Sequence, residues 1–133
     1  MSVKQVIVVR TKYPDGEGGT RGVRRGKEIA QACHASIAFL TKIITGEKKV
    51  HAIHLSEAKR EWLQGSFAKV CVRVDSEEEL LEIHEKAKEA GLESHLITDS
   101  GRTEFKEPTK TCLAIGPDYA EKIDPITGHL KLL

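Results

Sequence analysis

The feature that most constrains the fold is the valine-rich run VKQVIVVR, which occupies residues 3–10. A nearly continuous apolar run of this kind predicts a strand that is buried on both faces of a sheet. Three later segments are also predicted to be strands, at residues 68–74, 94–99 and 111–117. Helical segments separate the first three strands and favour parallel pairing, whereas the short polar loop before the last strand favours an antiparallel hairpin.

The predicted fold is therefore α/β, with one four-stranded mixed sheet and helices on both faces, in the order β-α-α-β-α-β-β. The chain has 133 residues, so we expect a single domain over residues 1–133. The first helix is predicted over residues 25–45, with an apolar residue every three or four positions, as in a stripe that faces the core. That stripe consists of Ile29, Cys33, Ile37, Leu40 and Ile44. Two further helices are predicted at 56–65 and 76–91, each with a serine N-cap and a terminal glycine.

The composition excludes several classes of protein. Hydrophobic residues make up 39% and charged residues 31% of the chain, as in a globular protein. No apolar run approaches the roughly 20 residues that span a membrane, and no apolar signal region follows Met1, so we expect a cytoplasmic protein without a membrane partner. No set of histidines and cysteines has metal-ligand spacing, so no metal site is predicted. Cys33, Cys71 and Cys112 are expected to be buried, reduced thiols.

A long loop, TKYPDGEGGTRGVRRG, lies between the first strand and the first helix. Its glycines and proline argue against regular structure, and a loop of this length in a compact domain is usually functional or disordered. Although the formal net charge of the chain is only +1, this stretch carries Lys12, Arg21, Arg24 and Arg25. A basic loop beside a candidate site indicates a polyanionic ligand, most often nucleic acid, although a merely solvated loop would carry the same charge.

Three polar residues share one narrow face of the first predicted helix. Lys27, Gln31 and His34 lie roughly a third of a turn from the apolar stripe when the helix is plotted at about 100° per residue. A lysine in the first turn opposes the helix dipole, whose positive end favours anions. Such a local conflict is expected where a ligand supplies the negative charge, although a frayed and exposed helix end would also explain it.

A second candidate site lies in ITDSGRTE, residues 97–104. The third predicted strand places Asp99 at its C-terminal end, where α/β sheets carry their ligand sites. Gly101 permits a tight turn, and Arg102 and Thr103 follow it. Asp99 could orient or deprotonate a water molecule, and Thr103 could hydrogen-bond that water. Ordinary turn chemistry would account for the same residues.

Taken together, these segments resemble the archaeal and eukaryotic type of peptidyl-tRNA hydrolase. The resemblance covers nearly the whole chain, and its specificity comes from the order and spacing of several motifs. These motifs are KQVIVVR, GKEIAQACHA, VDSEEELLEIHEKAKEAGL, ITDSGRTE, TCLAIGP and DPITGHLKLL. It implies a single α/β domain, often dimeric. The implied activity is hydrolysis of the ester between a peptide and the terminal ribose of tRNA, without metal or cofactor.

The resemblance also implies roles for individual residues. The implied catalytic residues are Lys27, Asp99 and Thr103. The residues expected to bind the substrate are Gln31, His34, Arg102, Lys12, Arg21, Arg24 and Arg25. The last four are expected to hold tRNA phosphates, from their charge and their proximity to the site.

The chain departs from the usual pattern mainly in the loop before Lys27, which is longer and richer in arginine than the common form DLKMGKGK. Two other functions fit the same residues: a non-catalytic relative that binds RNA or protein, and a hydrolase of another acyl ester or amide. Retention of Lys27, Asp99 and Thr103 together favours an enzyme over a binding module.

Overall fold

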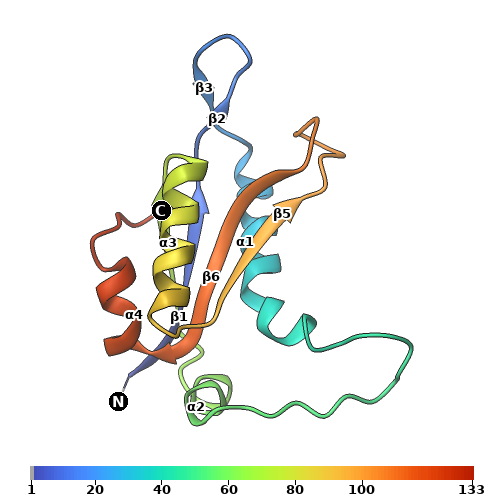
Figure 1. Ribbon diagram of the computed structural model, residues 1–133, viewed down its shortest axis with the longest axis vertical. Coiled ribbons are helices and arrows are strands. Elements are labelled where there is room, and N and C mark those ends of the chain that lie inside the picture. The colour runs from blue at the N-terminus through green and yellow to red at the C-terminus, as the bar shows by residue number, and fades with distance from the viewer. Residues whose placement is uncertain (1) are drawn as a thin grey trace.

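The computed structural model describes residues 2–133 and contains one four-stranded sheet with the strand order β4-β1-β6-β5 (Figure 1). The strands are β1 (Val3–Arg10), β4 (Lys69–Val74), β5 (Ser94–Asp99) and β6 (Thr109–Tyr119). β1 pairs with β4 in parallel, whereas β6 is antiparallel to both β1 and β5. The predicted mixed sheet is confirmed. Because β1, β4 and β5 run in the same direction, their C-terminal ends meet at one edge of the sheet.

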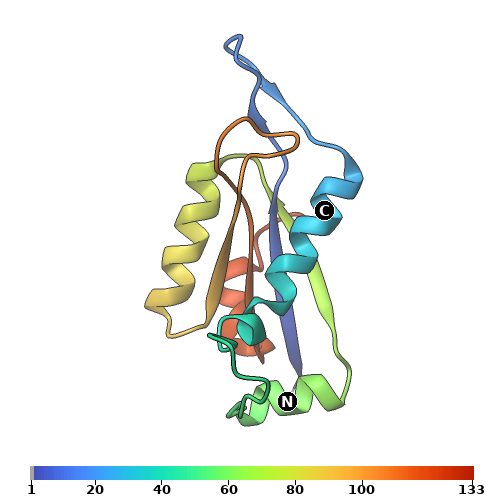
Figure 2. The same ribbon diagram turned by 90° about the vertical axis from the view of Figure 1, so that its right-hand side faces the viewer.

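Helices cover both faces of this sheet, as predicted (Figures 1 and 2). They are α1 (Arg25–Thr41), α2 (Glu57–Gln64), α3 (Glu77–Glu89) and α4 (Ala120–Thr127). Alternate residues of β1 divide the core: Val6 and Val8 pack with α3 and α4, whereas Ile7 and Val9 pack against α1. The last helix, α4, lies in a segment for which the sequence pattern predicted no helix.

The N-termini of α2 and α3 are capped as the sequence predicts. The hydroxyl of Ser56 accepts a hydrogen bond from the backbone N–H of Lys59, and that of Ser76 from Glu79. Each cap satisfies one of the backbone donors that the first turn of a helix leaves without a partner.

The loop after β1 corrects the prediction that it has no regular structure. It contains a short hairpin, formed by β2 (Tyr13–Pro14) and β3 (Thr20–Arg21), which projects beyond the sheet (Figure 1). The carboxylate of Asp15 accepts hydrogen bonds from the backbone N–H groups of Glu17 and Gly19, at 2.7 and 3.0 Å. These bonds close the turn. The same glycines that argued against regular structure allow it to be tight.

The predicted core stripe of α1 is wrong except at Leu40, which is half-buried and packs against the cluster that contains Phe39 and Trp62. Ile29 and Ile37 are 57% and 51% exposed, and Cys33, which was expected to be buried, is exposed as well. The helix ends at Thr41, so Ile44 lies in the connector that follows it. The buried residues of α1 are Gln31, Ala35, Ala38 and Phe39. The two alanines allow α1 to approach the sheet closely, whereas Ile29 and Ile37 lie on its exposed side.

Candidate active site

Lys27, Asp99 and Thr103 come from distant segments and meet at the edge where the strands end. Lys27 lies in the first turn of α1, Asp99 ends β5, and Thr103 belongs to the loop after β5. The ammonium Nζ of Lys27 donates hydrogen bonds to Oδ1 of Asp99 at 2.7 Å and to Oγ1 of Thr103 at 2.8 Å. The side chains of Lys27 and Asp99 are 14% and 10% exposed. The pair is therefore accessible to a ligand but shielded from most of the solvent.

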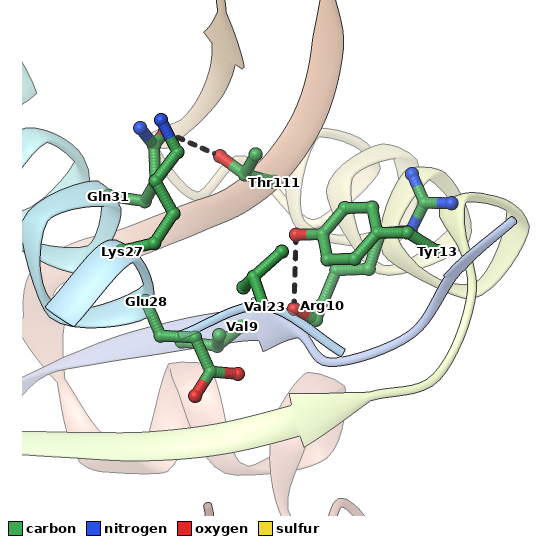
Figure 3. A pocket seen from close by; sticks show the side chains of 8 residues that line it. All are labelled: Val9, Arg10, Tyr13, Val23, Lys27, Glu28, Gln31 and Thr111. Atoms are coloured by element: carbon green, nitrogen blue, oxygen red, sulfur yellow. Dashed lines mark hydrogen bonds between the residues drawn. The ribbon is translucent and has the colours of Figure 1, made fainter. Parts of the chain in front are cut away.

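Gln31 connects this centre to the core of the protein. Its amide Nε2 donates to Oδ1 of Asp99 at 3.1 Å, and its Oε1 accepts a hydrogen bond from the hydroxyl of Thr111 at 2.7 Å (Figure 3). The Thr111 bond directs the amide nitrogen toward Asp99. Burial raises the pKa of the Cys112 thiol to about 12, so this thiol stays protonated and donates to the backbone carbonyl of Gln31.

The second oxygen of Asp99 is held by the turn that follows it. The backbone N–H of Gly101 donates to Oδ2 of Asp99 at 2.9 Å. Gly101 has a φ of +84°, and a Cβ there would lie 2.4 Å from the carbonyl carbon of Glu107. Only glycine fits this position without a shift of the backbone. The pKa of Asp99 lies below its ordinary value, chiefly because the Lys27 ammonium donates to the carboxylate and secondarily because of the Gly101 N–H and Gln31.

Two of the arginines expected to bind phosphate contact the loop that carries Thr103. Nε of Arg24 lies 3.2 Å from a carboxylate oxygen of Glu104, and Arg21 donates to the carbonyl of Glu104 at 3.2 Å. The other expected ligand-binding residues are Lys12, Arg25, His34 and Arg102. All four are exposed, and within residues 2–133 their side chains make no ion pair or hydrogen bond. His34 is thus placed in solvent rather than against Lys27 and Asp99.

A small pocket beside Lys27 shows residues that the sequence analysis did not identify (Figure 3). Its lining includes Lys27 and Gln31 together with Arg10, Tyr13 and Thr111. One signal for Arg10 was present in the sequence, because it is the charged residue that ends an otherwise apolar strand. Thr111 could have been inferred from the β5–β6 hairpin, whose register places the start of β6 beside Asp99.

Two further questions concern the described residues: whether they form a metal site and whether they contain a membrane-spanning helix. Within residues 2–133, no group of three or more His, Cys, Asp or Glu side chains could hold a metal ion. In the same part of the chain, no helix is both long enough and apolar enough to cross a membrane.

A carboxylate fixed by three donors, next to an ammonium and a hydroxyl, can orient a water molecule and stabilise a developing negative charge. On a mixed sheet, at the edge where α/β proteins place their sites, this combination is typical of an α/β hydrolytic enzyme. The family model described as peptidyl-tRNA hydrolase PTH2 matches residues 3–133. The chain belongs to the peptidyl-tRNA hydrolase PTH2 family, which confirms the resemblance seen in the sequence.

Individual relatives cover almost the whole chain. The peptidyl-tRNA hydrolase of Methanothermobacter thermautotrophicus is 47% identical over 98% of this chain and 100% of its own length. The peptidyl-tRNA hydrolase of Methanopyrus kandleri is 44% identical over 98% of this chain and 97% of its own. That of Methanocaldococcus jannaschii is 42% identical over 98% of this chain and 100% of its own.

Proposed function

We propose that this protein hydrolyses the ester bond between a peptidyl group and the terminal ribose of tRNA, and so returns the tRNA to translation in the cytoplasm. The observation that carries the proposal is the contact of Lys27 with both Asp99 and Thr103, within a chain of this family. Ester hydrolysis needs an oriented water molecule and a positive group near the oxyanion of the tetrahedral intermediate. Asp99 and Lys27 supply these two requirements at one point.

In this mechanism Asp99 accepts a hydrogen bond from the attacking water and takes its proton as the water oxygen adds to the ester carbonyl. Lys27 stabilises the oxyanion that forms. As the ammonium turns toward the oxyanion, its hydrogen bond to Asp99 weakens, and the pKa of Asp99 rises at the moment when Asp99 acts as a base. When the intermediate collapses, the bond to the ribose oxygen breaks, and that oxygen takes up the proton.

Thr103 and Gln31 position these groups. The Thr103 oxygen accepts a hydrogen bond from the Lys27 ammonium, so the Thr103 O–H is left free to donate a hydrogen bond to the substrate. Gln31 holds Asp99 through its amide. Lys12, Arg21, Arg24 and Arg25 supply positive charge for the tRNA backbone. Arg102, next to Thr103 in the chain, and His34 are assigned to substrate binding from the family motif. These assignments rest on charge, placement and the family motif.

The decisive experiment is incubation of the purified protein with an N-acetyl-aminoacyl-tRNA, followed by measurement of the released acyl amino acid. Release by the wild type, but not by Lys27→Ala at equal tRNA occupancy, supports the proposal. Binding of the tRNA without release would instead identify a non-catalytic RNA-binding relative. Equal cleavage of a simple acyl ester that lacks RNA would identify a hydrolase of another ester.

We also propose that two copies of the chain pair through the exposed stripe of α1, formed by Ile29, Cys33 and Ile37. These residues lie on consecutive turns, so they form a continuous apolar strip on the helix. An exposed stripe that contains two isoleucines, each more than half exposed, is typical of an interaction surface. A second copy would cover it with the same residues, as in a twofold interface.

A further inference from the structure

A cleft lies between the β2–β3 hairpin and residues 104–110, which project side by side beyond the same end of the sheet (Figure 1). Its volume is about 750 Å³, within the range of sites that take small ligands or short segments of larger ones. One wall of the cleft is formed by the β2–β3 hairpin. This hairpin lies in the expanded loop before Lys27, where the sequence departs from the common family form. Within residues 2–133, Arg21 is the one residue of the proposed mechanism that lines this cleft.

The most buried charged residue in the wall of the cleft is Arg10. This residue is only 6% exposed, yet within residues 2–133 it forms no ion pair with a carboxylate. Its Nε donates to the carbonyl of Lys12 at 2.9 Å, and its Nη1 donates to the carbonyl of Lys110 at 3.2 Å. A guanidinium has five N–H donors, so three are left without a described partner. A buried cation with only neutral acceptors favours an anion as its remaining partner.

Aromatic rings fix the direction of this guanidinium. The carbon Cζ of Arg10 lies 4.3 Å from the centre of the Tyr13 ring, and the side chain runs along that ring (Figure 3). The Tyr13 ring packs on Phe105 at 4.7 Å, and Phe105 in turn lies 5.6 Å from the Lys27 ammonium. Both rings are buried, so they support the two cations rather than stack on a ligand. The aromatic pair therefore lies between the candidate catalytic lysine and Arg10.

The acidic residues around the cleft are mostly engaged elsewhere. Glu104 pairs with Arg24 at 3.2 Å, and Glu77 lies 3.8 Å from Lys110. The carboxylate of Asp15 closes the hairpin turn. The charged lining residues that remain without an ion pair among residues 2–133 are Arg10, Asp15, Arg21, Lys106 and Glu107. Three cations and two carboxylates leave a small excess of unpaired positive charge in the cleft.

We propose that this cleft binds a phosphodiester of the single-stranded 3′ end of the tRNA substrate, with the Arg10 guanidinium as the principal contact. The inference rests on the proposed function, because it places the RNA next to the reacting ester. A planar guanidinium fork matches two oxygens of a phosphate. Arg10 also lines the small pocket beside Lys27, so one RNA strand could reach the reacting centre and the cleft together.

The test is the affinity of the full-length protein for a fluorescently labelled RNA hexamer that ends in CCA, measured by anisotropy at several salt concentrations. Arg10→Gln is expected to weaken binding by about tenfold or more and to reduce the salt slope by about 0.7. Arg60→Gln is the matched control, because Arg60 is exposed on α2, at the opposite end of the molecule from the hairpin (Figures 1 and 2). It should bind as the wild type does. A folded Arg10→Gln protein with wild-type affinity and slope would overturn the proposal.

A second variant tests the proposal independently, in case the Arg10→Gln protein does not fold. Lys106→Glu changes an exposed residue of the cleft and is expected to weaken hexamer binding by about tenfold, with Lys122→Glu on α4 as its control. If Arg10→Gln does not fold, unchanged binding by Lys106→Glu overturns the proposal by itself. Inorganic phosphate is the competitor. Displacement of the hexamer by phosphate at equal concentration would assign the cleft to free phosphate and overturn the RNA assignment.

The hexamer-binding experiment and the hydrolysis experiment can fail independently of each other. Hexamer binding that depends on Arg10, in a protein that releases no acyl amino acid from N-acetyl-aminoacyl-tRNA, would support the cleft and refute the hydrolase. Normal release with hexamer binding indifferent to Arg10 would support the hydrolase and refute the cleft.

Discussion

Asp99 is the residue on which the proposed chemistry depends most directly. Asp99→Asn keeps the shape and the hydrogen bond to Gly101 but removes the charge and the ability to take a proton. We expect single-turnover hydrolysis to fall by about a hundredfold or more, with unchanged tRNA affinity. The protein should still fold, with a somewhat lower thermal unfolding midpoint because the ion pair with Lys27 is lost. An asparagine variant with near-normal turnover would reduce Asp99 to a residue of the turn.

Thr111 is expected to act through Gln31 rather than on the substrate. Thr111→Val removes the hydroxyl that orients the Gln31 amide while keeping the size of the side chain. We expect turnover to fall by roughly tenfold and the loss of stability to be about 1 kcal/mol, as for one hydrogen bond. Thr127→Val is a matched control, because Thr127 is also buried and its hydroxyl also donates a hydrogen bond, to the carbonyl of Ile123 in α4. If both variants lose turnover equally, the effect of Thr111 is merely structural.

The Lys27–Asp99 contact predicts a change in a measurable pKa. Lys27→Met should raise the pKa of Asp99 toward its ordinary value of about 3.9, because the largest cause of its lowering is removed. A carboxyl group with a lowered folded-state pKa stabilises the fold above its unfolded pKa, and this contribution is lost as the pH falls through the folded value. The wild type should therefore lose more stability on acidification than Lys27→Met. NMR titration of the Asp99 carboxyl carbon measures the shift, and Lys86→Met on α3 should leave it unchanged.

At the scale of elements, α1 shows where sequence periodicity is informative and where it is not. The pattern identifies which residues share a face of the helix, and Lys27 and Gln31 do lie together. It does not say which face the sheet covers. That choice depends on the close approach permitted by Ala35 and Ala38, and on Phe39, which packs with Trp62 of α2. The strands and the caps of α2 and α3 were predictable because their signals are local. Thr111 joins the site through its contact with Gln31 of α1, 80 positions away, and Arg10 contacts the Lys110 carbonyl, 100 positions away. A local pattern can mark such residues as unusual but cannot show which residues they contact.

The exposed stripe of α1 makes a prediction of its own. Ile37→Lys places a charge in the proposed twofold interface and should convert a dimer into a monomer in sedimentation velocity. Glu82→Gln, which changes the net charge by the same amount on α3, should leave the dimer intact. A wild-type protein that sediments as a monomer would contradict the proposed pairing.

At the scale of the whole molecule, we expect catalysis to be independent of metal. Within residues 2–133 no cluster of side chains has the composition of a metal site, and the proposed steps use only the side chains of Lys27, Asp99, Thr103 and Gln31. Activity should survive dialysis of the protein against EDTA, when the tRNA is kept in its own magnesium buffer. Complete loss of activity, restored by adding zinc back to the protein, would overturn this expectation.

The Lys27–Asp99 contact joins residues 72 positions apart, and the Thr111–Gln31 contact joins residues 80 positions apart. Contacts of such long range form late, because closing a long loop costs entropy before the contact repays it. The site therefore exists only after α1 and the β5–β6 hairpin have docked on the same sheet. A nascent chain still lacking β6 has no assembled centre. Catalytic activity during refolding consequently reports the completion of the tertiary structure rather than the formation of any helix.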